Sequence, residues 1–250
     1  MKLIMEENAC DFNRRSAAEI ARFIQNKPDA RICFATGETT KGIYAELAEL
    51  YKQGEVDFSR VTAFVLDEYQ GASRMNPASC LARLEAQLFG PVHLPEEHIH
   101  SFDSAAADLH HVCMEYENII RSEGGIDLQI LGIGTNGHIG FNEPGASFDS
   151  ISRVVEVGQE TIVARSEMFG SKELVPRTGV TMGIKTIMNS ANIYLFAVGA
   201  SKAQMLEKAL FGPIVPDIPA SVLQLHPSLT VIADKEAAAK LPGPILVQPE

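Results

Sequence analysis

Cysteine is scarce in this 250-residue sequence, and its few thiols lie far apart at Cys10, Cys33, Cys80 and Cys113. No two of them form a C-x-x-C pair, so their spacing fits neither a disulfide framework nor a zinc ribbon. We therefore expect reduced thiols and a cytoplasmic protein. Cys33 lies in an apolar run and is an expected core residue.

Positive charge and long apolar runs are also in short supply. The chain has 21 Lys and Arg against 32 Asp and Glu, a formal net charge of −11. Nucleic acids and anionic membranes select basic surfaces, so neither is an expected partner, whereas a few local donors can still hold a small anionic substrate. No apolar stretch reaches the roughly 18–20 residues of a membrane helix, and residues 1–12 lack the apolar core of a signal peptide. The expected partner is a small molecule, and the chain is expected to be a monomer or a homo-oligomer.

The histidines do not indicate a metal site. His98 and His100 have poor ligand spacing, and His110 and His111 lie in a helical stretch where adjacent side chains diverge. We expect no metal.

Apolar runs alternate with amphipathic stretches along the chain. Five runs are nearly continuous in apolar and β-branched residues, as parallel strands covered on both faces should be, at 31–37, 61–69, 126–134, 192–199 and 229–234. Helical patterns lie between them at 14–26, 42–53, 76–89, 105–122 and 201–210, and Asn76 with Pro77 predicts the start of the third. The alternation predicts a doubly wound, mostly parallel α/β sheet with helices on both faces, as one domain over 1–250. Ligands of such sheets bind beyond the carboxyl ends of the strands.

Two turns that follow strands have features of anion sites. In ATGETTKG (35–42), Gly37 allows a tight turn, three threonines offer hydroxyls, and backbone N–H groups open the next helix. It is not a P-loop, because Gly-Lys-Ser/Thr is missing. In VGASKAQ (198–204), Lys202 falls in the first turn of a helix, where a bound anion would offset its unfavourable interaction with the helix dipole. The alternatives are an ordinary turn and an exposed lysine.

The segment LDEY (66–69) places two carboxylates directly after a buried strand. A carboxylate at that edge is partly desolvated, which raises its pKa and suits proton abstraction next to a carbonyl. Asp67 and Glu68 are both candidates. The alternative is a solvated loop acid or a helix cap.

The segment LGIGTNGHIGFNEPG (131–145) has glycines in G-x-G-x-x-G spacing, but Asn142, Pro144 and Gly145 leave no room for the helix of a dinucleotide site. The glycines instead allow a loop to approach a ligand. His138 and Glu143 can pair within this loop, so that one ring nitrogen is held and the other is free to take a proton from a sugar hydroxyl. A buried structural histidine is the alternative.

These segments resemble, in order, those of the glucosamine-6-phosphate deaminase/isomerase family, together with VPRTGVTMGIKTIM (175–188) and IPASVLQLHP (218–227). The resemblance covers residues from about 30 to 235, and the string GHIGFNEP is its most specific part. It implies a Rossmann-like fold and a hydrolase/isomerase that uses no metal or nucleotide cofactor. The implied reaction is aldose–ketose isomerisation with deamination, from glucosamine 6-phosphate to fructose 6-phosphate and ammonia.

The resemblance also implies roles for individual residues. Asp67 matches the acid that moves a proton between C2 and C1, His138 the base that opens the sugar ring, and Glu143 its partner carboxylate. Asn136 matches a further ring-opening position. The positions that match phosphate ligands are Thr36, Gly37, Thr39 and Lys202.

Two positions depart from the family pattern and leave alternatives open. Glu38 stands where the family's phosphate loop usually has Gly or Ser, and Glu167 stands where the family's lid usually has Arg, with Arg165 close by. These changes suit a galactosamine-6-phosphate deaminase/isomerase as an alternative. A 6-phosphosugar lactonase on the same fold and a non-catalytic sugar-phosphate sensor are the others, although the FNEP and LDEY strings favour a deaminase.

Overall fold

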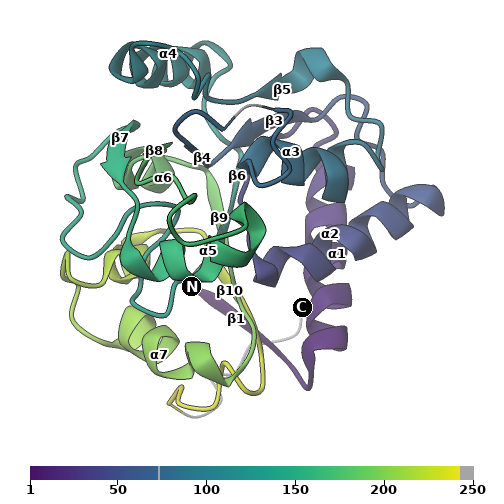
Figure 1. The fold of residues 1–250 in the computed structure, drawn as a ribbon. Helices are drawn as coiled ribbons and strands as arrows, with labels where there is room; N and C mark the ends of the chain where they lie inside the picture. The colour runs from purple at the N-terminus through teal and green to yellow at the C-terminus, as the bar shows by residue number, and fades with distance from the viewer. Residues whose placement is uncertain (73, 243–250) are drawn as a thin grey trace.

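The centre of the molecule is a parallel sheet of seven strands in the order β1-β10-β9-β6-β2-β3-β5 (Figure 1). The computed structural model describes residues 1–72 and 74–242, so residues 243–250 of the predicted domain lie outside it. The strands are β1 (Lys2–Glu6), β2 (Arg31–Phe34), β3 (Thr62–Val65), β5 (Ile99–His100), β6 (Leu128–Gly132), β9 (Asn192–Ala197) and β10 (Leu229–Asp234). The predicted α/β fold is confirmed, and each of the five predicted runs contains one central strand. The edge strands β1 and β5 have no counterpart in the prediction.

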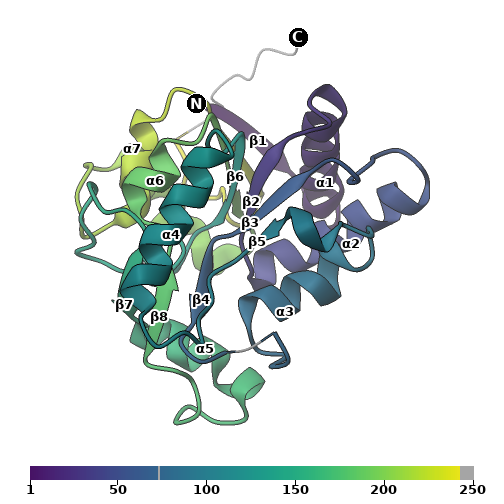
Figure 2. The ribbon, with the colours of Figure 1, turned by 90° about the horizontal axis from the view of Figure 1, so that it is seen from above.

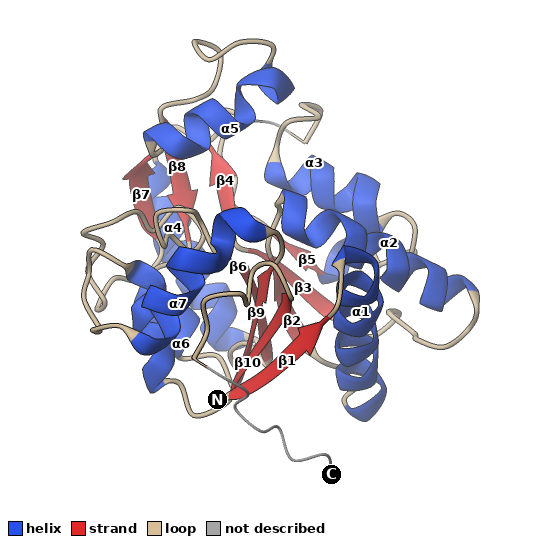
Figure 3. Cartoon of the chain, turned by 90° about the horizontal axis from the view of Figure 1, so that it is seen from below, coloured by secondary structure: helices blue, strands red, loops and turns tan. Residues whose placement is uncertain are grey.

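Helices cover both faces of this sheet (Figures 2 and 3). One layer contains α1 (Ala9–Asn26), α2 (Glu38–Lys52) and α3 (Cys80–Leu84), and the other contains α4 (Leu109–Ser122), α6 (Ile184–Met188) and α7 (Ala203–Phe211). Successive strand residues serve the two layers in turn, because their side chains point to opposite faces. In β2, Ile32 and Phe34 join the first core and Cys33 joins the second.

The third predicted helix begins later than the Asn-Pro signal indicates. Ser79 caps α3, since its hydroxyl accepts from the Ala82 N–H at 3.0 Å. Asn76 instead accepts from the Ala78 N–H at 3.0 Å in the preceding turn. The prediction of Asn76 as the cap is therefore wrong, because a turn with its own side-chain hydrogen bond precedes the helix. A π-helical segment, Glu85–Phe89, continues α3.

A second, antiparallel sheet adjoins the first and is not predicted by the sequence pattern. Its strands are β4 (Asp67–Tyr69), β8 (Thr178–Thr181) and β7 (Arg153–Glu156), and β8 lies between the other two. The run at 61–69 is therefore two strands that separate at Leu66. The Leu66 N–H donates to the Phe34 carbonyl of β2 at 3.1 Å, and the Leu66 carbonyl accepts from the Met182 N–H at 2.9 Å. Asp67 follows this change of partner and so lies at the junction of the two sheets.

The remaining helix, α5 (Gln159–Phe169), is also not predicted. Its buried residues are Thr161 and Ile162, so it lacks the apolar stripe that marks most surface helices. Lys202 lies on a 3-10 turn, Ala200–Lys202, immediately before α7, and a second 3-10 segment spans Pro219–Leu225.

The thiols are unpaired in the structure, with Cys10 exposed and the other three buried. Within the described residues, no helix is both long enough and apolar enough to span a membrane.

Candidate active site

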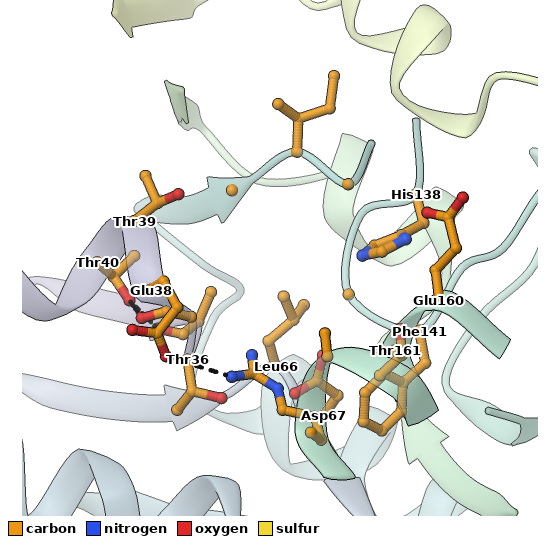
Figure 4. Close-up of a pocket in the computed structure, with 18 of the residues that line it drawn as sticks. Thr36, Glu38, Thr39, Thr40, Leu66, Asp67, His138, Phe141, Glu160 and Thr161 are labelled. Atoms are coloured by element: carbon orange, nitrogen blue, oxygen red, sulfur yellow. Dashed lines mark hydrogen bonds and ion pairs between the residues drawn. The ribbon is translucent and has the colours of Figure 1, made fainter. Parts of the chain in front are cut away.

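A pocket of about 440 Å³ opens at the carboxyl ends of the central strands (Figure 4). Its walls are the segments that follow β2, β3, β6 and β9, together with one side of α5. Figure 4 shows Thr36, Glu38 and Thr39 on one side, His138 and Glu160 on the other, and Asp67 between them. Loops that are far apart in the sequence meet here because parallel strands end at the same edge of the sheet.

The structure distinguishes the two carboxylates of LDEY. Asp67 lines the pocket although only 7% of the residue is exposed. Burial raises the pKa of its carboxyl group to about 7, and the nearby Glu68 acts in the same direction. Glu68 instead accepts backbone N–H groups from Tyr69, Cys80 and Leu81 at 2.8, 3.0 and 3.0 Å. It therefore ties α3 to β4, and Asp67 is the carboxylate that a ligand would meet.

His138 lines the opposite wall and is held by a short hydrogen-bonded chain. Its Nδ1 lies 2.8 Å from Asn136 Oδ1, and Asn136 Nδ2 donates to Glu143 Oε2 at 2.8 Å. Because a carboxylate can only accept, the Asn136 amide must present its oxygen to the ring, and Nδ1 must carry the proton. Nε2 is then the acceptor of the neutral imidazole. Burial also lowers the pKa of His138, which favours this neutral form.

Asn136 and Glu143 support this ring without lining the pocket. Glu143 Oε2 is 3.7 Å from His138 Nδ1, farther than the Asn136 oxygen, so the expected histidine–carboxylate pair is bridged by an amide. Thr161 Oγ1 of α5 donates to the other Glu143 oxygen at 3.3 Å.

Glycine is required where this loop passes close to the ring. A Cβ on Gly134 would overlap the imidazole of His138, and Gly137 has a φ of +89°. Residues 133–152, all described, contain no helix, as expected when the dinucleotide interpretation is rejected.

The expected phosphate ligands lie together at the other end of the pocket. Thr36, Gly37 and Thr39 line it at the start of α2, whose first backbone N–H groups favour an anion. The Thr40 hydroxyl is instead directed to the carbonyls of the loop, at 3.3 Å. Lys202 also lines the pocket, and burial lowers its pKa.

Two arginines compensate the negative charge of Glu38. Glu38 Oε1 lies 3.6 Å from Arg165 Nη1 and 3.8 Å from Arg83 Nη2. Arg165 lines the pocket, whereas Glu167 is exposed and is not among the lining residues. Position 165 therefore supplies the pocket cation that position 167 does not.

Some pocket residues have no signal in the sequence. Cys80 comes from α3 and Glu160 comes from α5, neither of which follows the strand-end pattern. Arg83 of α3 approaches Glu38 without lining the pocket. Glu160 accepts from the Thr135 hydroxyl at 2.7 Å and so joins α5 to the histidine loop. A three-residue cluster of His, Cys, Asp or Glu able to hold a metal does not occur within 1–72 and 74–242.

The sequence model of the family described as glucosamine-6-phosphate isomerases/6-phosphogluconolactonase matches residues 5–232. A glucosamine-6-phosphate deaminase of Clostridium botulinum (strain Loch Maree / Type A3) is 46% identical over 241 residues, which are 96% of this chain and 99% of that protein. Glucosamine-6-phosphate deaminase 2 of Bacillus subtilis (strain 168) is 46% identical over 243 residues, which are 96% of this chain and 98% of the relative.

Solved structures are also similar to this chain. A monomeric glucosamine-6-phosphate deaminase superposes with a TM-score of 0.93 at 39% identity, covering 96% of this chain and all of that one. A 6-phosphogluconolactonase of Thermotoga maritima superposes with a TM-score of 0.73 at 21% identity, covering 93% and 98%. The second likeness is one of fold alone.

Proposed function

The chain belongs to the family of glucosamine-6-phosphate isomerases and 6-phosphogluconolactonases, and we propose that its pocket converts glucosamine 6-phosphate to fructose 6-phosphate and ammonia. The observation that carries the proposal is the presence of Asp67 and His138 on the walls of one pocket. One group is suited to carbon acid chemistry and the other to a sugar hydroxyl.

We propose that His138 opens the sugar ring. Its unprotonated Nε2 takes the proton of the C1 hydroxyl, and the same proton is returned to the ring oxygen as the C1–O5 bond breaks. Asn136 and Glu143 keep Nδ1 protonated, so Nε2 remains the basic nitrogen. The product of this step is the open-chain aldehyde.

Asp67 then moves a proton from C2 to C1, while a second proton passes from the amine nitrogen to the C1 oxygen. The C1 aldehyde and C2 amine become a C1 alcohol and a C2 imine. Water adds to C2, and ammonia leaves. A pKa of about 7 suits this carboxylate, because a general base works best when its pKa lies near the operating pH. The relatives support isomerase and deaminase activity, and we propose that hydrolysis is confined to the imine.

The 6-phosphate is proposed to bind at the opposite end of the pocket, on Thr36, Gly37, Thr39 and Lys202. We add Arg165, which lines the same region.

A phosphate cannot cross a bilayer readily because its charge is costly to desolvate, so we also propose that the chain acts in the cytoplasm, where such a substrate is retained. The monomeric relative favours a monomer, which light scattering on the pure protein would test.

Ammonia release tests the assignment. The purified protein is incubated with glucosamine 6-phosphate, galactosamine 6-phosphate and 6-phosphogluconolactone in parallel. We expect ammonia and fructose 6-phosphate from the first, little turnover of the second and no hydrolysis of the third. Asp67→Asn should bind the sugar phosphate yet lose roughly 10²–10⁴-fold or more in kcat. Absence of ammonia from the unaltered protein, or full activity in Asp67→Asn, would refute the function or the role of Asp67, respectively.

A further inference from the structure

The thiol of Cys80 lies against the carboxylate of Asp67. Cys80 Sγ is 3.3 Å from Asp67 Oδ1, the residues are 3% and 7% exposed, and both line the pocket. Burial raises the pKa of Cys80 well above its ordinary value, with the negative charge of Asp67 acting in the same direction. The group is therefore a protonated thiol, and in this pair it is the donor.

The backbone around Cys80 is fixed independently of its side chain. Glu68 accepts the N–H groups of Cys80 and Leu81, so the first turn of α3 is held beside β4. Ser79 caps the same turn through its hydroxyl. A change at the Cys80 side chain leaves these three hydrogen bonds available, and α3 is expected to keep its place.

The other charged groups near Asp67 do not hydrogen-bond to it. Glu68, Arg165 and Arg83 act on its carboxylate through their charges. Across the part of the chain that the structure describes, the Cys80 thiol is the one group that donates a hydrogen bond to it. The contact engages Oδ1, and no residue within 1–72 and 74–242 hydrogen-bonds to Oδ2.

We propose that Cys80 is a positioning residue for the proton transfer: its thiol holds one oxygen of Asp67, stabilises the carboxylate form and directs the other oxygen at the substrate carbon. The inference rests on the proposed function. Cys80 keeps its own proton throughout, while Asp67 accepts a proton from C2 and returns it to C1. The hydrogen bond is strongest to the ionised carboxylate and weakens on protonation, as expected for a group that tunes this base.

The test compares pH profiles of kcat/KM for the unaltered protein, Cys80→Ala, Cys80→Ser and Cys113→Ala. The acid limb reports the ionisation of the free enzyme's base. Loss of the donor in Cys80→Ala should move this limb upward by about one pH unit, with roughly tenfold lower kcat/KM below it. Cys80→Ser restores a donor and should return the limb to its original position or lower. The substrate's own titrations are common to all four proteins and cancel in the comparison.

Cys113→Ala is the matched control, because it removes a thiol that is also buried but lies in α4 outside the pocket. A structural effect alone would lower activity at every pH without moving the limb. An unmoved limb in Cys80→Ala, or the same shift in Cys80→Ser, overturns the proposal.

A second measurement is independent of turnover. Carbon-13 NMR titration of Asp67 in the substrate-free proteins should give a higher pKa in Cys80→Ala than in the unaltered protein, and equal values would overturn the role of Cys80. A protein that shows this difference but releases no ammonia refutes the proposed function while keeping the contact. An active protein without the difference refutes Cys80 alone.

Discussion

Replacing Asp67 with Asn should stabilise the folded protein while abolishing its activity. The pKa of Asp67 rises from an ordinary 3.8 to about 7, chiefly because the carboxylate is buried. In the pH range between these values the folded state holds a proton that the unfolded state has lost. Stability therefore falls as the pH rises through this range, and above about pH 7 the folded protein carries the full cost of a buried carboxylate.

The size of this loss of stability follows from the rise of about 3 units in the pKa of Asp67. Each pKa unit corresponds to about 1.4 kcal/mol, so above pH 7 the folded state is about 4 kcal/mol less stable than it would be with a neutral side chain at this position. Asparagine is neutral at every pH, has nearly the same shape and can still accept from the Cys80 thiol. Asp67→Asn should thus raise the free energy of unfolding by about 4 kcal/mol at pH 8, by between about 1 and 2 kcal/mol at pH 5, and by almost nothing below about pH 3.

Urea or thermal unfolding at pH 5 and pH 8 measures this difference. A gain of about 4 kcal/mol corresponds to a rise in Tm on the order of 10 °C for a chain of this size. Asp217→Asn is the matched control, because Asp217 is exposed, and it should give no pH-dependent difference. This prediction is refuted if Asp67→Asn is no more stable than the unaltered protein at pH 8, or if its gain in stability does not shrink toward pH 5. Either result would mean that the ionised Asp67 carboxylate does not destabilise the folded state.

Other substitutions test the support of His138, the binding of phosphate and the anchoring of α3 separately. Asn136→Ala removes the acceptor that holds Nδ1 of His138. Steady-state kinetics should show a roughly 10–100-fold fall in kcat with little change in KM, by analogy with other hydrogen bonds that support a functional histidine. Arg165→Met should raise the KM for glucosamine 6-phosphate several-fold at nearly constant kcat, whereas Glu167→Met should leave both unchanged; equal effects would place the phosphate elsewhere. Glu68→Ala leaves three backbone N–H groups without their acceptor and should lower the free energy of unfolding by about 1–3 kcal/mol in urea titrations, with an undiminished value arguing against its anchoring role.

Features that arise from local chemistry along the chain can be predicted without the structure. The five apolar runs predict central strands because a strand buried on both faces must be apolar throughout, and this holds however the strands are ordered. The glycines and histidine of 131–145 and the threonines of 35–42 follow such strands. Their meeting at one edge follows from parallel strand direction, which the alternation with helices already indicates.

Which groups face the pocket depends on how distant segments of the chain pair and pack. Two adjacent carboxylates look alike in the sequence, but β4 pairs with β8 rather than continuing β3, and this pairing turns Asp67 to the pocket and Glu68 to α3. Cys80 and Arg165 reach the site from α3 and α5, which do not follow the strand-end pattern. Their contribution depends on packing between elements that are distant along the chain. Hydrophobic periodicity predicts which face of an element is buried, but it does not predict which element packs against that face.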